Sequence, residues 1–192
     1  ECPECGHRYE SNWWGSFDLP EFCTGTYTQS RIDTAKKVSK LFAESILNDE
    51  NNNRLGVIGF AGFWGGQNDP SALRATENLT DNLNDVEAAI DDMYASGGTN
   101  YTAALDQAYD WLNAREGAER DRPAFVVFIS DGSPGSDGGD YRNTNWNGAN
   151  EATDIKALGP TLYTIGIDLD DTASSYLQGL ATSANHYINV TG

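Results

Sequence analysis

The sequence of 192 residues is poor in basic side chains: 12 Lys and Arg stand against 29 Asp and Glu, for a formal net charge of −17. Binding to a nucleic acid backbone or an anionic membrane needs a basic face, so this balance argues against both kinds of partner. Runs of 18 apolar residues are lacking, which excludes a membrane-spanning helix of ordinary length. The length fits one domain with a sizeable core, and the acidity fits a solvated surface in a salty or extracellular setting.

Signatures of catalysis are also lacking. The chain contains no Gly-x-Gly-x-x-Gly or phosphate-loop motif after a strand and no Gly-x-Ser-x-Gly elbow. Of the two histidines, His7 lies in a Cys-rich stretch and His186 precedes the last apolar run, where a surface or packing role is expected. We therefore expect a binding protein and not an enzyme.

Cysteine is confined to the first 23 residues, which contain Cys2, Cys5 and Cys23. The stretch "CPECGH" has the shape of a zinc knuckle, in which His7 and Cys23 would complete a Cys3His set. The alternative is one disulfide and one remaining thiol in an oxidising compartment. The sequence leaves both readings open.

The chain divides into two parts by composition. Residues 1–23 carry Cys, Gly, Pro and the pair Trp13-Trp14 without a sustained period, so we expect an irregular segment packed on the domain by its aromatic side chains. Residues 24–192 alternate between helical and strand-like patterns. The chain begins with Glu1 and shows no signal-like apolar segment, so we expect it to be a processed product or a piece of a longer protein.

The alternation of helices and buried strands predicts an α/β fold. We expect a doubly wound, mostly parallel sheet with helices on both faces. The apolar stretch "RPAFVVFIS" reads as a central strand buried on both faces. The predicted elements are a helix over 31–47, a strand over 54–60, a helix from Ser71 to Tyr94 with a break near Thr80, a helix from Asn100 to Ala114, the strand over 122–130, a helix over 149–158, a strand over 161–168, a helix over 171–182 and an edge strand over 186–190.

Ligands of such sheets bind beyond the carboxyl ends of the strands. Asp131 follows the strand over 122–130 directly and therefore lies at this edge. The turn that contains Thr99 and the segment "TGTYT", with Thr24 and Thr26, can reach the same edge. Taken singly, these residues also suit simpler roles, because Thr26 or Ser30 can cap a helix and Asp-Gly is a common turn pair.

Three stretches together resemble the von Willebrand factor A family and its metal-ion-dependent adhesion site. "SGGTNYTAAL" and "FVVFISDGSPG" are similar to the second and third pieces of the family pattern, and "TGTYTQSRIDTAKKV" is similar to its first piece. The pieces occur in the family order over about residues 24–190. The resemblance implies a Rossmann-like domain of the bacterial adhesin or pilus-tip type, with a degenerate site. The implied metal ligands are Thr24, Thr26, Thr99 and Asp131.

The first stretch departs from the family pattern, since Phe22 stands where the family has an aspartate. Asp18 or Glu21 could replace that carboxylate if the backbone follows a different course. Mg²⁺ takes six oxygen ligands and is often held by one or two carboxylates and several waters. A site with one carboxylate would leave the ion more positive, which favours an acidic ligand but weakens retention of the free ion.

The resemblance implies an extracellular, cell-surface module that captures an acidic group of a protein partner or host surface through Mg²⁺, Mn²⁺ or Ca²⁺. Two alternatives remain: a metal-free subunit of a surface filament that binds neighbouring subunits, and an intracellular scaffold with a zinc ribbon.

Weaker signals lie elsewhere in the chain. "NTNWNG" followed by Asp154 has the spacing of a calcium loop but lacks carboxylates in its first half. Asn78, Asn100 and Asn189 lie in Asn-x-Thr sequons. The loops expected to set ligand specificity contain Trp64, Asp137, Asp140 and Trp146.

Overall fold

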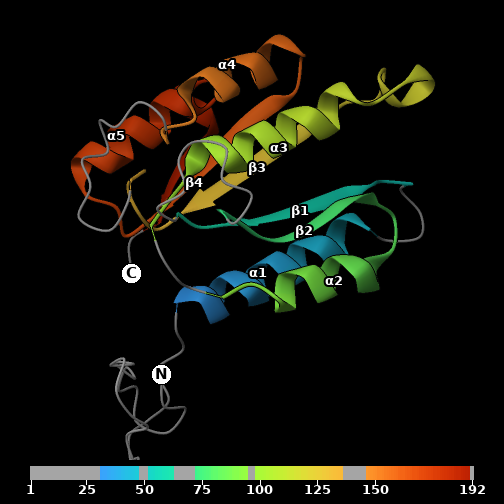
Figure 1. Ribbon diagram of the computed structural model, residues 1–192, viewed down its shortest axis with the longest axis horizontal. Helices are drawn as coiled ribbons and strands as arrows, with labels where there is room; N and C mark the ends of the chain where they lie inside the picture. Colours follow the sequence, from blue (N-terminus) through green and yellow to red (C-terminus); the bar gives the residue numbers. More distant parts are fainter. Residues whose placement is uncertain (1–30, 48–51, 63–71, 95–97, 136–145, 191–192) are drawn as a thin grey trace, which may run out of the picture.

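The computed structural model describes residues 31–47, 52–62, 72–94, 98–135 and 146–190. Within these ranges, helices and strands alternate along the chain as an α/β fold requires (Figure 1). The elements are α1 (Arg31–Ile46), β1 (Leu55–Phe60), β2 (Leu73–Thr80), α2 (Leu83–Asp91), α3 (Tyr101–Asn113), β3 (Phe125–Ser130), α4 (Ala149–Ala157), β4 (Thr161–Ile167), α5 (Asp171–Leu180) and β5 (Tyr187–Val190), with short 3₁₀ turns at Gly117–Glu119 and Ala184–His186.

The described strands form two sheets. Strands β3, β4 and β5 are parallel and pair in the order β3-β4-β5, with Phe125 opposite Thr161 and Thr164 opposite Tyr187. Strands β1 and β2 form a separate antiparallel pair, with Leu55 opposite Thr80. The expected α/β fold is confirmed, including the edge position of β5.

The prediction of one helix from Ser71 to Tyr94 is wrong in its first half. Leu73–Thr80 is a strand, and only Leu83–Asp91 is helical. Antiparallel pairing with β1 satisfies the backbone groups of this stretch. Asn82 then starts α2, since its side-chain oxygen accepts a hydrogen bond from the Asn84 N–H at 3.1 Å. Pairing with a distant strand has overridden the local helical signal.

Strand β3 also differs from the expected strand with two buried faces. Phe128 and Ser130 are buried on one face, whereas Phe125 is 61% and Val127 42% exposed on the other. Among the described residues β3 pairs only with β4, so it forms one edge of its sheet.

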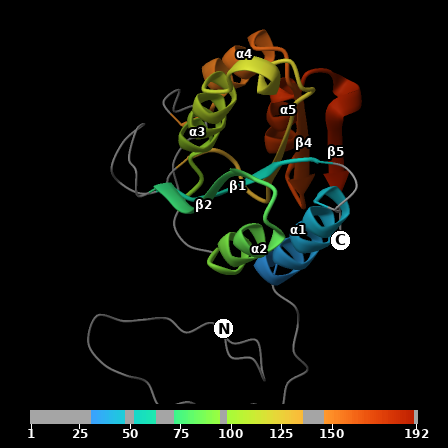
Figure 2. The same cartoon turned by 90° about the vertical axis from the view of Figure 1, so that its right-hand side faces the viewer.

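Helices lie on both sides of the strands. α3, α4 and α5 lie above β3, β4 and β5, whereas α1 and α2 lie on the opposite side (Figures 1 and 2). The main core lies beneath the first set of helices, where Phe60, Tyr101 and Phe128 form an aromatic cluster with ring centroids 4.8–6.1 Å apart. The buried core residues are Tyr101, Ala104, Leu105, Leu112, Phe128, Ala152, Ile155, Leu162, Leu177 and Leu180.

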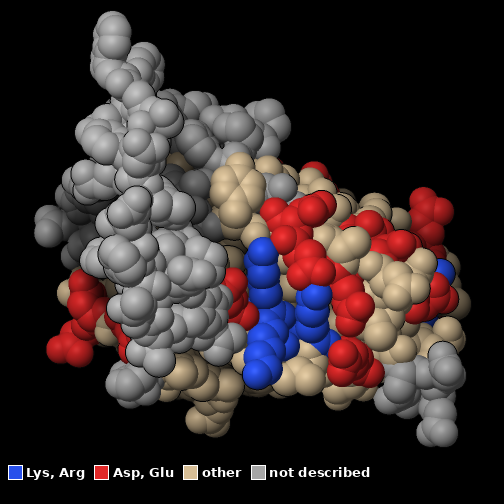
Figure 3. All heavy atoms as spheres, turned by 90° about the horizontal axis from the view of Figure 1, so that it is seen from below, with Lys and Arg blue, Asp and Glu red and all other residues tan. Residues whose placement is uncertain are grey.

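A smaller core joins α1 and α2 to the antiparallel pair. Ala43, Leu47, Val86 and Ile90 are buried there. At the surface of the two helices, the Lys40 ammonium lies 2.6 Å from the Asp91 carboxylate, and Lys36 donates to the Asp91 carbonyl at 2.8 Å. Figure 3 shows basic side chains gathered among acidic ones on this side of the molecule. The pair is exposed, so its contribution to stability is small.

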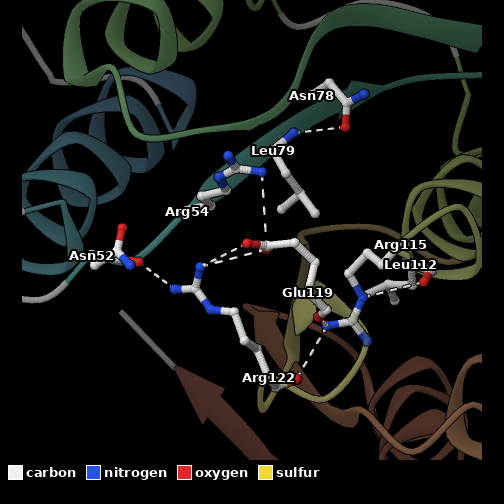
Figure 4. Close-up of polar contacts among 8 residues, drawn as sticks. All are labelled: Asn52, Arg54, Asn78, Leu79, Leu112, Arg115, Glu119 and Arg122. Carbon is white, nitrogen blue, oxygen red and sulfur yellow. Dashed lines mark hydrogen bonds and ion pairs between the residues drawn. The ribbon is translucent and has the colours of Figure 1, made fainter. Parts of the chain in front are cut away.

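A polar network ties the two sheets together at the amino-terminal ends of β1 and β3 (Figure 4). Arg122, just before β3, donates to the Asn52 carbonyl and to the Glu119 carboxylate, the latter at 3.2 Å. Arg54, just before β1, lies 3.9 Å from the same carboxylate. Arg115 donates to the Arg122 carbonyl at 3.2 Å. The starts of β1 and β3 are therefore held near one another.

No helix in the described ranges is long and apolar enough to cross a membrane.

Candidate functional site

The candidate site lies at the carboxyl ends of the strands, as expected for this type of sheet. Asp131 follows β3 directly and is exposed. Thr99 immediately precedes the cap of α3 and comes from a different part of the chain. The structure brings these two predicted site residues to the same edge.

Backbone pairing fixes the loop of Thr99 against the loop that follows β3. The Thr99 N–H donates to the Gly135 carbonyl at 2.8 Å, and the Gly135 N–H donates to the Thr99 carbonyl at 2.9 Å. On the other side, the Gly98 N–H donates to the Gly62 carbonyl at 2.9 Å, just after β1. Three loops are thus joined side by side by main-chain hydrogen bonds.

The Thr99 hydroxyl faces the turn that contains Asp131. A Cβ atom placed on Gly132 would lie 3.2 Å from Thr99 Oγ1, a tight approach. Because Gly132 has no side chain, the Thr99 hydroxyl fits against it, one residue away from Asp131. This arrangement places one hydroxyl oxygen and one carboxylate on neighbouring segments.

Two side chains that the sequence analysis did not single out shape this turn. Tyr101 Oη donates to the Gly132 carbonyl at 2.6 Å, and Ser130 Oγ donates to the same carbonyl at 2.9 Å. The Gly132 N–H donates back to Ser130 Oγ at 3.3 Å. Burial raises the pKa of Tyr101 to about 12, although a hydrogen bond with Ser130 partly offsets this effect. Tyr101 therefore stays a neutral donor at physiological pH. The signal in the sequence was the apolar periodicity of α3, which marks Tyr101 only as a core residue.

Asn100 anchors the Thr99 loop from inside the molecule. Its side chain is 0% exposed, and Oδ1 accepts a hydrogen bond from the Ala103 N–H at 3.0 Å at the start of α3. The backbone N–H of Asn100 donates to the Ala61 carbonyl at 3.3 Å. This role as a buried cap leaves no accessible amide for a glycan, so the Asn100 sequon is not a modification site in this fold.

Trp146 is packed into the wall of the site. It is 6% exposed, and its carbonyl accepts from the Tyr101 N–H at 3.0 Å. A Cβ atom on Gly62 would lie 2.6 Å from the Trp146 ring. Trp146 was expected in a loop that sets ligand specificity, but its ring is turned inward. Asp154, the last position of the calcium-loop spacing, is exposed on α4.

Several predicted site residues lie outside the described residues, and their predictions stay untested. They are the metal-ligand candidates Thr24 and Thr26, the disulfide or zinc candidates Cys2, Cys5, His7 and Cys23, the residue Phe22 that replaces a carboxylate, and the loop residues Trp64, Asp137 and Asp140.

The oxygen atoms at this edge of the sheet are of the types that bind a hard divalent cation. Mg²⁺ prefers carboxylate, hydroxyl and water oxygens, and the edge offers the Asp131 carboxylate and the Thr99 hydroxyl. No group of three or more His, Cys, Asp or Glu side chains with metal-binding geometry occurs in the part of the chain that the structure describes. The pair would therefore supply part of an oxygen shell, and the remaining ligands would have to come from Thr24, Thr26, water or a partner.

Comparison with solved structures shows the same fold in proteins of low sequence identity. The von Willebrand factor domain of the type V pili tip protein Mfa5 from Porphyromonas gingivalis is 14% identical, with a TM-score of 0.62, and covers 84% of this chain and 83% of that one. The SpRpn10 VWA domain is 16% identical, with a TM-score of 0.53, and the match covers 84% and 75% of the two chains.

A third similar structure, proximal thread matrix protein 1 from the mussel byssus, was solved with zinc in its metal-ion-dependent adhesion site. It is 22% identical, with a TM-score of 0.57, and the match covers 84% of this chain but only 39% of that one. No curated protein matches the sequence. The family model of the von Willebrand factor type A domain matches residues 23–192. The chain therefore belongs to the von Willebrand factor type A family.

Proposed function

We propose that the domain binds a divalent cation at the edge of Thr99 and Asp131, and captures an acidic group of a protein partner through that ion. The observation that supports this most directly is the pairing of Thr99 with Gly135, which holds the Thr99 hydroxyl against Gly132 beside the Asp131 carboxylate. Thr24 and Thr26 are the proposed further ligands. Mg²⁺ or Mn²⁺ fits the oxygen donors best, and the role is binding rather than catalysis.

The chemistry of the donor set favours an acidic ligand. Asp131 is one carboxylate, and hydroxyl ligands are neutral, so a bound divalent cation would keep a net positive charge. An Asp or Glu side chain of the partner would neutralise this charge and complete the shell. The mussel protein with zinc in its adhesion site supports metal binding by a fold of this kind.

We further propose that the protein acts at an extracellular surface. The net charge of −17 suits a salty or extracellular setting, and two of the similar structures come from a pilus tip and from byssus. The loops that contain Trp64, Asp137 and Asp140 adjoin the edge in sequence and are proposed to select the partner.

Calorimetric titration of the chelator-treated protein with Mg²⁺ and Mn²⁺ tests the proposal. We expect saturable binding that Asp131→Ala weakens at least about tenfold, because the variant removes the charged ligand. Asp121→Ala is the matched control, since Asp121 is exposed in a turn before β3 and its loss changes the net charge equally. Equal binding by the native protein and both variants would reveal only general attraction of cations to an acidic surface, and would overturn the proposal.

A metal-free role in a surface assembly is the second candidate. Phe22 in place of a carboxylate favours it, as does the likeness to a pilus-tip domain. A metal-free role predicts that titration with Mg²⁺ or Mn²⁺ gives no saturable heat. It also predicts that the protein self-associates and that a chelator does not reverse this association. Light scattering after size exclusion, with and without chelator, distinguishes the two roles.

A further inference from the structure

Tyr101 connects the two segments that carry the proposed metal ligands Thr99 and Asp131. It lies two residues after Thr99 on the same segment. Its hydroxyl donates to the carbonyl of Gly132, the residue directly after Asp131, at 2.6 Å. A side chain from the Thr99 segment therefore holds the backbone of the Asp131 segment.

The two segments are linked at both ends. Tyr101 Oη donates to Gly132 at one end. At the other end, the backbones of Thr99 and Gly135 exchange two hydrogen bonds, at 2.8 and 2.9 Å. The two segments therefore form a closed ring. Asp131 is attached directly to this ring, so its position relative to Thr99 is fixed while both links hold.

The core fixes the position of the Tyr101 hydroxyl. Tyr101 is 0% exposed, and its ring meets the rings of Phe128 and Phe60 edge-on, with centroids 4.8 and 6.1 Å away. A tyrosine side chain has only two rotatable angles, and close aromatic neighbours restrain both. The hydroxyl is thus a donor at a fixed place, from which it can hold a loop.

Gly132 is the residue at which the Asp131 turn needs an external restraint. Glycine has no Cβ atom and adopts more backbone conformations than other residues. A Cβ atom at this position would lie only 3.2 Å from Thr99 Oγ1, so a bulkier and less mobile residue would crowd that hydroxyl. The hydrogen bond from Tyr101 supplies the restraint from outside the turn.

Ser130 cannot replace Tyr101 in this role. Ser130 Oγ donates to the same Gly132 carbonyl at 2.9 Å and accepts from the Gly132 N–H at 3.3 Å. Both bonds lie within the segment that follows β3, so they shape the turn without tying it to Thr99. Ser130 does leave the Gly132 carbonyl with a donor when the Tyr101 hydroxyl is removed. Tyr101→Phe therefore creates no unsatisfied backbone group.

We propose that Tyr101 is a positioning residue of the metal site, whose hydrogen bond to Gly132 keeps the Asp131 carboxylate and the Thr99 hydroxyl within reach of one divalent cation. This inference rests on the proposed function. Tyr101 acts from the core and does not itself touch the ion. Residues that orient metal ligands from behind typically change metal affinity by about 10- to 100-fold when they are replaced.

Calorimetric titration of the native chain, Tyr101→Phe and Tyr176→Phe with Mn²⁺ tests the inference. Tyr176→Phe is the matched control, because Tyr176 Oη donates to the Asn147 carbonyl at 2.8 Å and its ring lies 6.5 Å from that of Tyr101. Each variant loses one tyrosine hydroxyl that holds a backbone carbonyl. We expect Tyr101→Phe to weaken Mn²⁺ binding about tenfold and Tyr176→Phe to weaken it less than about twofold.

NMR spectroscopy of isotopically labelled protein reads the link itself, independently of affinity. In the metal-free protein, Tyr101→Phe should shift the carbonyl carbon signal of Gly132, because that carbonyl loses one of its two donors. Tyr176→Phe should leave this signal in place. In the native protein, saturation with Mg²⁺ should shift the signals of the Gly132 carbonyl and the Ser133 amide more than that of the Asn147 carbonyl.

The outcomes separate this inference from the proposed function. Equal Mn²⁺ binding by the native protein and Tyr101→Phe would overturn the inference and leave the metal site standing. Equal weakening by Tyr101→Phe and Tyr176→Phe would indicate general loosening of the fold and would also overturn it. If the native protein bound neither ion, the proposed function would fail and the inference with it. Should Tyr101→Phe not fold, the absence of a Mg²⁺-induced shift at Gly132 in the native protein would overturn the inference.

Discussion

Gly62 lies where three segments of the site meet, and only the absence of a side chain permits this approach. A Cβ atom there would lie 2.6 Å from the Trp146 ring and 2.7 Å from the Thr99 nitrogen. We expect Gly62→Ala to lower the free energy of unfolding by about 1–3 kcal/mol, because backbone must shift to make room. Urea denaturation measures the change.

The matched control for this substitution is Gly179→Ala. Gly179 is in α5, and a Cβ atom there would meet nothing within 4 Å. This variant should be stabilised by about 0.5–1 kcal/mol, since alanine favours a helix over glycine. Equal effects of the two substitutions would contradict the close packing of the three segments.

Tyr101 should make the stability of the folded protein depend on pH in the alkaline range. Burial raises its pKa to about 12 from the ordinary value of 10.0, and burial likewise raises the pKa of Tyr176 to about 12. Above pH 10 the unfolded chain loses these protons before the folded one does, so stability is full below pH 10 and falls as the pH rises toward 12.

Denaturation in urea at several pH values between 9 and 11.5 checks this expectation. The buried Tyr101 contributes a slope of at most about 1.4 kcal/mol per pH unit, and Tyr176, which is only half-buried, contributes less. Tyr101→Phe should be less stable near neutral pH, because the hydrogen bond to Gly132 is lost. The stability of Tyr101→Phe should also fall less steeply above pH 10 than that of the native protein. An unchanged alkaline slope in this variant would contradict the buried, neutral state of Tyr101.

At the scale of elements, the aromatic cluster connects β1, β3 and α3. Phe128 is buried and contacts Phe60 and Tyr101 at centroid distances of 5.1 and 4.8 Å. We expect Phe128→Ala to cost about 3–5 kcal/mol in stability, because a large cavity forms where the two sheets meet. Thermal and chemical unfolding measure this loss.

Leu158→Ala serves as the comparison at the end of α4, where Leu158 is exposed. Its cost should be about 1 kcal/mol or less. A similar small cost for Phe128→Ala would show that the cluster does not hold the sheets together.

Most elements could be predicted from the sequence, because their apolar periods are sustained over whole helices and strands. α1, α3, α5, β3 and β4 occur within a few residues of the expected bounds. β2 could not, since "LRATENLT" is polar on one side, follows a helix-cap signal and becomes a strand only by pairing with β1. The exposure of Phe125 depends on what covers β3, which no local pattern reveals.

The candidate site shows the same limit. Thr99 and Asp131 could be placed together from the motif and from the rule that strand ends share one edge. Tyr101, Ser130 and the buried Asn100 could not, because their roles depend on hydrogen bonds between loops that are distant in the sequence.

At the scale of the whole molecule, the net charge of −17 must destabilise the compact state by self-repulsion. We expect the free energy of unfolding to rise as NaCl increases from about 0.05 M to about 0.5 M, because salt screens exposed charges beyond a few ångströms. Denaturation in urea at several salt concentrations measures this. A decrease would indicate that surface ion pairs such as Lys40 with Asp91 outweigh the repulsion.

The central claim is that a divalent cation binds beside Thr99 and Asp131. Paramagnetic Mn²⁺, added in small amounts to isotopically labelled protein, broadens the NMR signals of nearby amides and so locates the ion. We expect the earliest broadening at Thr99, Gly132 and Gly135, and its loss in Asp131→Ala. Broadening centred instead on the acidic end of α2, around Asp91 and Asp92, with the amides of the Thr99 loop and the Asp131 turn unaffected, would contradict the account.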